Sequence, residues 1–164
     1  MINIRLANVE DLTTVEQLAR EIWPVAYKGI VAPEALDYML NLIYSNAALR
    51  DQLQNQHHTF LMVELDGKPV AFAAFSTIEP GVSKLHKLYV HQNTQGTGIG
   101  KKLVDFITGH LQSQSVHTIR LNVNRQNKAR FFYEKLGFVI MKEEDVDLGN
   151  GVFMVDYVME KELI

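Results

Sequence analysis

Three glycines alternate with other residues in the segment QGTGIGK, which spans residues 95–101. The apolar run LYV (residues 88–90) comes shortly before this segment, and a helix-like periodic stretch, GKKLVDFITGHL, begins at Gly100. Glycine loses much conformational entropy on folding, so three of them between two regular elements indicate a specific use of the bare backbone. A strand, a glycine turn and a helix start in this order predict an anion site, because free amides at a helix N-terminus point outward.

The spacing of the glycines excludes two common phosphate-binding motifs. The dinucleotide fingerprint is GxGxxG, whereas the spacing here is GxGxG. The phosphate loop of nucleotide hydrolases needs GxxxxGK followed by Ser or Thr, and GTGIGKK is one residue short and lacks the hydroxyl. Taken alone, the segment is therefore either an anion-binding loop of another kind or a flexible turn without a ligand.

Hydrophobic periodicity predicts helices and strands along the whole chain. The Asn8 segment is typical of a helix cap, and Pro24, Gly29 and Pro33 predict a break after the first helix. The predicted strands cover residues 2–6, 59–65, 70–78, 84–91, 117–123, 138–148 and 152–160, and the predicted helices cover about 12–22, 33–43, 47–54, 99–111 and 128–136. This order predicts an α+β fold with a single mixed sheet, in one domain over residues 1–164.

Composition limits the classes of function that the chain can have. A net charge of −3 argues against a nucleic-acid binder that neutralises phosphates. The chain contains no cysteine, which excludes thiol catalysis and thiolate metal sites, and His57-His58 has no partner at metal-ligand spacing, so we expect no metal. The N-terminus lacks a signal-peptide pattern and no apolar run approaches membrane-spanning length, so we expect a cytoplasmic protein that binds no membrane.

Two segments in this order resemble the GCN5-related N-acetyltransferases (GNAT). QGTGIGKKL resembles the signature (Gln/Arg)-x-x-Gly-x-(Gly/Ala), with Gln95, Gly98 and Gly100 at the signature positions. LNVNRQNKARFFYEKLGF, residues 121–138, resembles the second motif of the family. Its matching residues are Asn127, Ala129, Tyr133, Glu134, Lys135, Gly137 and Phe138. IRLANVEDL also resembles the usual first strand and helix, so the resemblance covers nearly the whole chain.

The resemblance implies the acyl-CoA N-acyltransferase fold: a mostly antiparallel, twisted sheet of about seven strands, flanked by helices, with a splayed central strand pair. It also implies acetyl-CoA as cosubstrate. The backbone around Leu88 and Val90 would face the pantetheine arm, and the glycine loop would hold the diphosphate. Asn127 would lie close to the cofactor. The implied cofactor-binding residues are Leu88, Val90, Gln95, Gly96, Thr97, Gly98, Ile99, Gly100, Lys101 and Asn127.

Two residues are candidates for acid–base catalysis. Tyr133 resembles the family tyrosine that gives a proton to the departing thiolate, although the apolar stripe of its helix is also consistent with core packing. Many family members place a glutamate on the strand before the glycine loop, where this chain has Lys84 and His86 on the same face and no carboxylate. His86 is the candidate base because of its intrinsic pKa. A hydrogen-bonded core histidine, a water chain, or an amine that arrives already neutral are the alternatives.

The acceptor site is expected after the first helix, where WPVAY holds the single tryptophan. Trp23 and Tyr27 are the candidate acceptor-binding residues, since aromatic faces can hold a cationic amine, and aromatic core packing is the alternative. The predicted function is direct acetyl transfer from acetyl-CoA to an amine of a small molecule or peptide. The rival is a non-catalytic acyl-CoA-binding sensor or interaction domain. The predicted partners are acetyl-CoA and the amine, with a homodimer left open.

Overall fold

The computed structural model describes residues 1–163. Its elements follow in the order β1 (Ile2–Leu6), η1 (Val9–Asp11), α1 (Leu12–Ala26), α2 (Pro33–Tyr44), α3 (Asn46–Gln54), β2 (Thr59–Leu65), β3 (Lys68–Glu79), β4 (Val82–Val90), η2 (Gln92–Thr94), α4 (Ile99–Ser113), β5 (Thr118–Asn124), α5 (Ala129–Lys135), β6 (Val139–Asp147) and β7 (Phe153–Glu162). Every strand and helix predicted from the sequence is present, with bounds shifted by a few residues. Among the described residues, no helix is both long enough and apolar enough to cross a membrane.

The strands form one seven-stranded sheet in the order β1-β2-β3-β4-β5-β7-β6. All neighbouring strands are antiparallel except β4 and β5, which confirms the predicted mixed, mostly antiparallel sheet. The parallel pair is short, because β4 and β5 are in register only from Val82 opposite Thr118 to Leu85 opposite Leu121. Beyond Leu85 the two strands separate, so the predicted splayed central pair is also confirmed and the later part of β4 lacks a partner on that side.

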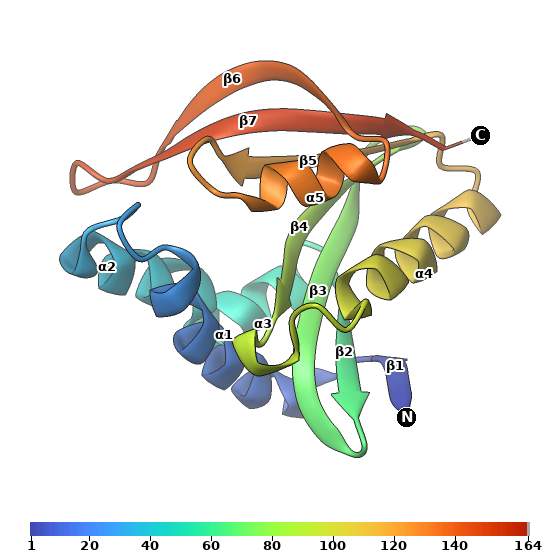
Figure 1. Cartoon of the computed structure of the whole chain (residues 1–164), viewed down its shortest axis with the longest axis horizontal. Coiled ribbons are helices and arrows are strands. Elements are labelled where there is room, and N and C mark those ends of the chain that lie inside the picture. The colour runs from blue at the N-terminus through green and yellow to red at the C-terminus, as the bar shows by residue number, and fades with distance from the viewer. Residues whose placement is uncertain (164) are drawn as a thin grey trace.

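Helices cover both faces of the sheet. Helices α1, α2 and α3 lie on one side of β2, β3 and β4, and α4 lies on the other, with α5 beside β5 (Figure 1). Alternate side chains of β2 follow this division: Phe60 and Met62 join the core under α1–α3, while Leu61 and Val63 join the core under α4 and α5. Because both faces are covered, this strand is a continuous apolar run and does not alternate between apolar and polar residues.

Local sequence signals account for the element ends around α1. Asn8 accepts a hydrogen bond from the Glu10 amide, and Asp11 accepts one from the Asn8 amide, so the predicted cap is present. The predicted break comes later than the sequence suggested: α1 continues through Pro24 to Ala26 and ends at Tyr27. Trp23 and Tyr27 therefore share one face of the same helix end, with ring centroids 4.8 Å apart.

The β6–β7 hairpin extends beyond the rest of the sheet and reaches over the end of α2 (Figure 1). Its turn contains Gly149, Asn150 and Gly151, all with positive φ, as tight reversals require. The hydroxyl of Tyr38 on α2 donates a hydrogen bond of 2.6 Å to the Leu148 carbonyl beside this turn. This hydrogen bond connects the hairpin to α2.

Candidate active site

The glycine loop between β4 and α4 uses backbone conformations that other residues rarely adopt. Gly98 is the residue before α4 and has a φ of 82°, and Gly96 has a φ of 83°. A Cβ atom added at either position would meet nothing within 4 Å, so these glycines are needed for their backbone conformation and not to avoid a clash. The absence of side chains also leaves the space in front of the loop open. Gly100 is different, because a Cβ there would lie 3.1 Å from the Phe132 ring.

A first cavity, of about 590 Å³, opens in front of this loop, where β4 and β5 separate. Its volume lies in the range of small-molecule sites. Nine of the predicted cofactor residues line it: Leu88, Val90, Gln95, Gly96, Gly98, Ile99, Gly100, Lys101 and Asn127. Thr97 does not line the cavity, because its hydroxyl donates a hydrogen bond back to the Thr94 carbonyl. The amides of a helix N-terminus and the unpaired edge of β4 fit a diphosphate and an amide-bearing arm.

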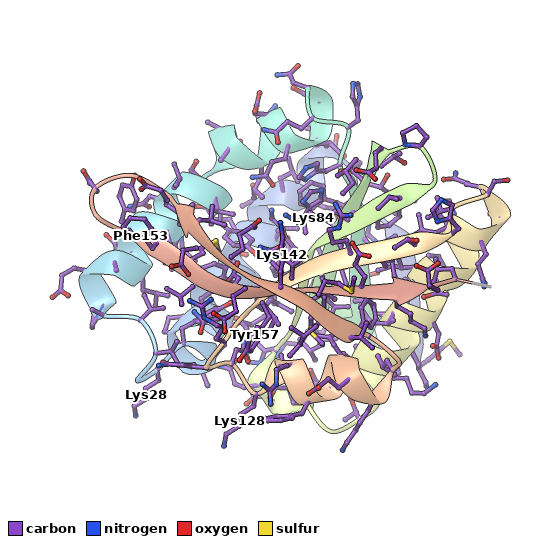
Figure 2. The ribbon with its side chains drawn as sticks, turned by 90° about the horizontal axis from the view of Figure 1, so that it is seen from above. Lys28, Lys84, Lys128, Lys142, Phe153 and Tyr157 are labelled. Atoms are coloured by element: carbon purple, nitrogen blue, oxygen red, sulfur yellow. The ribbon has the colours of Figure 1, made fainter. Side chains whose placement is uncertain are left out.

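Two polar side chains of the loop have different partners from those the sequence suggested. Gln95 donates to the Val90 carbonyl at 3.0 Å and so fastens the loop to β4. Lys101 forms an exposed ion pair of 2.8 Å with Asp105 one turn along α4. Lys128 lines the same cavity, is exposed, and has no ion pair among the described residues. In Figure 2 it projects outward from the edge of the molecule, on the other side of the β6–β7 hairpin from Lys84.

Tyr133 on α5 lines the first cavity and is buried, with only 7% of its surface exposed. It packs edge-on against Phe132 and Phe138, so it contributes to the core and to the cavity wall at once. Burial raises the pKa of its hydroxyl well above the ordinary value, which keeps the group protonated. Asn127 also has two roles: its side chain accepts from the Ala129 amide at 2.9 Å and lines the cavity.

A second cavity, of about 230 Å³, lies on the α1–α3 side of β4, under the β6–β7 hairpin. Trp23 and Tyr27 both line it, and neither lines the first cavity. Both are nearly fully buried, so they also belong to the core, and Trp23 contacts Tyr44 and Tyr89 through its ring. Tyr89 lines both cavities, which places the boundary between them at β4.

His86 lines the second cavity but is poorly suited to act as a base. Its Nε2 atom lies 2.6 Å from the Ser76 hydroxyl, and its ring stacks on His58 with centroids 3.9 Å apart. Burial, with the nearby His58 and two lysines as smaller contributions, lowers the pKa of His86 to about 3. A base this weak accepts a proton poorly from an ammonium group, so the hydrogen-bonded core alternative describes His86 better.

Sequence reasoning missed two charged residues that line the second cavity, Asp156 and Lys87. Asp156 on β7 is 4% exposed, and burial raises the pKa of its carboxyl. Asn122 donates to it at 3.1 Å. Its signal in the sequence is a single carboxylate within the apolar run FMVDYVM.

Lys87 on β4 is 5% exposed, whereas strand alternation in the sequence favoured Lys84 and His86 as the inward pair. A β-bulge explains the difference. Ala74 of β3 pairs with Lys87 and Phe75 pairs with Leu85, so His86 is the extra residue of β4 at the bulge.

A family model described as an acetyltransferase (GNAT) domain matches residues 30–161. The chain is 32% identical to a spermidine N(1)-acetyltransferase of Thermoplasma acidophilum, over 98% of this chain and 96% of that protein. It is 35% identical to a mycothiol acetyltransferase of Streptomyces coelicolor over 49% of this chain and 26% of that protein. A crystal structure of a PaiA N-acetyltransferase of T. acidophilum in complex with coenzyme A superimposes with a TM-score of 0.84 at 30% identity, over 99% of both chains.

Proposed function

The chain belongs to the GNAT family of acetyltransferases, and on this premise we propose how the two cavities that meet at Tyr89 divide the reaction. It is an acetyl-CoA-dependent N-acetyltransferase, and acetyl-CoA is its cosubstrate. In our proposal the first cavity takes acetyl-CoA, and the second takes the amine. The observation that supports this division is the single residue Tyr89, which lines both cavities at β4, so that a thioester and an amine held in the two cavities meet there.

Two of the buried groups have the chemistry that the transfer needs. The amine nitrogen attacks the thioester carbonyl, the new carbon–nitrogen bond forms, and the carbon–sulfur bond breaks. Asp156 takes the proton that the amine loses, because burial favours the protonated carboxyl. Tyr133 gives its proton to the departing thiolate, and both groups return to their starting states by proton exchange through solvent. The transfer is direct, because the chain has no cysteine to form a thioester with the acetyl group.

The acceptor in this proposal is the primary amine of a small molecule that fits a cavity of about 230 Å³. Trp23 and Tyr27 close the wall of that cavity nearest α1. The T. acidophilum relative is named a spermidine N(1)-acetyltransferase, so the acceptor panel includes a polyamine. A cytoplasmic location and a homodimer stay predictions, as does the single domain over residues 1–164.

An acceptor panel tests the proposal. Purified protein with acetyl-CoA and single amines, including amino acids, polyamines and amino sugars, should release CoA together with an equal amount of N-acetylated product. Asp156→Asn should lower kcat by about 100-fold with the best amine, as removal of a general base commonly does. Binding of acetyl-CoA without transfer to any amine would favour the sensor alternative. Unchanged turnover by Asp156→Asn would remove that residue from the mechanism.

A further inference from the structure

The ammonium group of Lys87 belongs to a buried side chain and has no anionic partner among the described residues. Its side chain is 5% exposed and lines the second cavity. Among residues 1–163 it has no ion pair and no hydrogen bond, and its Nζ atom lies over the rings of Tyr44 and Phe60, 5.2 and 5.9 Å from their centroids. A buried ammonium group without an anion is costly, and such groups are normally paired.

The nearby groups supply no negative charge to Lys87 among the described residues, since two are neutral histidines and a third is another lysine. His58 and His86 line the same end of the cavity, and the charge of Lys87 helps to lower the pKa of each. Lys84 also lines the cavity, and Asp156 is the one carboxylate among the lining residues that the structure describes. Burial raises the pKa of Asp156 and the charge of Lys84 partly opposes this, whereas burial alone lowers the pKa of Lys87. The cavity therefore offers one carboxylate and an unpaired ammonium group at separate places.

Three other buried polar atoms of residues that line this cavity also lack a hydrogen bond among the described residues: Nε1 of Trp23, Oε1 of Gln52 and Nδ1 of His58. His58 is 9% exposed and stacks flat on His86. In the tautomer that carries the proton on Nδ1, this atom is a donor, so a buried donor and a buried ammonium group both lack an acceptor in the same cavity.

We propose, on the basis of the function proposed above, that the acceptor is a small amino-carboxylate, such as an amino acid, whose amine faces Asp156 and whose carboxylate pairs with Lys87. The carboxylate supplies the anion that Lys87 lacks and an acceptor for His58. The ammonium form of the amine is attracted by Asp156, which then removes its proton.

The placement of Lys87 on β4 suits a molecule of this length. Lys87 and Tyr89 are two residues apart on one strand, so both point to the α1–α3 face, about 7 Å apart at roughly 3.3 Å per residue. Tyr89 marks the boundary with the first cavity, where the amine must react. An amino acid spans about half of this separation, and one hydrogen bond covers most of the rest. A polyamine would instead place a second cation beside Lys87 and Lys84, where like charges repel.

Matched acceptor pairs test this assignment on the unmodified protein. The common L-amino acids, their carboxamides and spermidine are compared by kcat/KM at saturating acetyl-CoA. The expected result is a preference of tenfold or more for the best free acid over its carboxamide, since a carboxamide cannot pair with the ammonium group. Equal use of acid and carboxamide, or faster use of spermidine, would overturn the proposal and leave the acetyltransferase function intact.

A variant then assigns the preference to Lys87. Lys87→Met should remove it by raising KM for the acid, with KM for acetyl-CoA unchanged, while the exposed control Lys68→Met should retain it. Lys87→Met should fold, because it replaces an unpaired buried charge with an apolar side chain of similar length. Retention of the preference by this variant would contradict the assignment.

A binding measurement covers the case in which no amine is acetylated. N-acetyl amino acids and N-acetyl amino acid amides are titrated by calorimetry into the CoA-bound protein. The proposal requires tighter binding of the acids, lost in Lys87→Met, whatever the outcome for turnover. Equal binding of acids and amides would overturn it, whereas a failure of transfer with selective acid binding would count against the proposed function alone.

Discussion

The hydroxyl groups of Tyr27 and Tyr89 lie 2.9 Å apart, one at the end of α1 and the other on β4. Tyr27 lines only the second of the two cavities, whereas Tyr89 lines both. Burial raises the pKa of the Tyr27 hydroxyl, and its hydrogen bond with Tyr89 partly opposes this effect. Tyr27 therefore shapes the acceptor side of the boundary.

Tyr27→Phe should raise KM for the amine several-fold and leave KM for acetyl-CoA unchanged. The substitution removes the hydroxyl that holds Tyr89 but keeps the ring that packs on Trp23. Alanine is unsuitable at this position, because deleting a buried aromatic ring commonly costs about 3–5 kcal/mol of folding stability. Separate titrations of the two substrates make the measurement. If only the KM for acetyl-CoA rises, Tyr27 acts on the acetyl-CoA side of the boundary, and the prediction is contradicted.

Tyr133→Phe should lower kcat by about 100-fold with little change in the affinity for acetyl-CoA, because a general acid acts mainly as the thiolate forms. The ring contacts with Phe132 and Phe138 persist in the variant, so folding should be preserved. Tyr157→Phe on β7, outside both cavities, is the matched control and should turn over normally. Normal turnover by Tyr133→Phe would reduce Tyr133 to a core residue.

Acetyl-CoA should raise the melting temperature of the wild-type protein, because a ligand that binds the folded state stabilises it. Gly98→Asp should abolish this response, since the backbone at this position has a positive φ that aspartate adopts less readily than glycine, and the new carboxylate would face the diphosphate. Gly109→Ala, inside the helix α4 that follows Gly98, is the control: nothing lies within 4 Å of its added Cβ, so the response should persist. The control should also gain roughly 0.5–1 kcal/mol of stability from the better helix propensity of alanine. A full response to acetyl-CoA by Gly98→Asp would refute the loop as the diphosphate site.

The stability difference between Lys87→Met and the wild type should depend on pH. Burial lowers the pKa of Lys87 to about 7 from 10.5, so between these values the unfolded chain binds more protons at this residue than the folded chain. Wild-type stability therefore rises with pH in this window, with a slope of at most about 1.4 kcal/mol per pH unit from this residue. The advantage of Lys87→Met should be largest below pH 7 and shrink towards pH 10. Urea unfolding of both proteins across this range makes the measurement, and a constant difference would show that Lys87 keeps its ordinary pKa.

The sequence predicted the elements well because they follow from local patterns, whereas the residues expected at the first cavity came from the resemblance to the GNAT family. The glycine spacing, the apolar periodicity and the cap at Asn8 act within a few residues, and the structure retains all three. The second cavity was harder, because its charges come from distant elements. Asp156 lies on β7 and Lys87 on β4, and their common cavity depends on the path of the β6–β7 hairpin.

Two errors of detail have local physical causes. Pro24 lies inside α1, because neighbouring turns hold the helix despite the one hydrogen bond that proline removes. The bulge at His86 changed which strand residues face the acceptor side, and strand alternation alone does not reveal a bulge.

A single-turnover experiment tests direct transfer between adjacent cavities most closely. Protein in excess over acetyl-CoA is mixed with the best acceptor of the panel, and the intact protein mass, free CoA and N-acetylated product are followed over time. We predict that CoA and product appear at the same rate and in equal amounts, with the protein mass unchanged throughout. A protein that gains the mass of one acetyl group and loses it at the rate of product formation would contradict direct transfer.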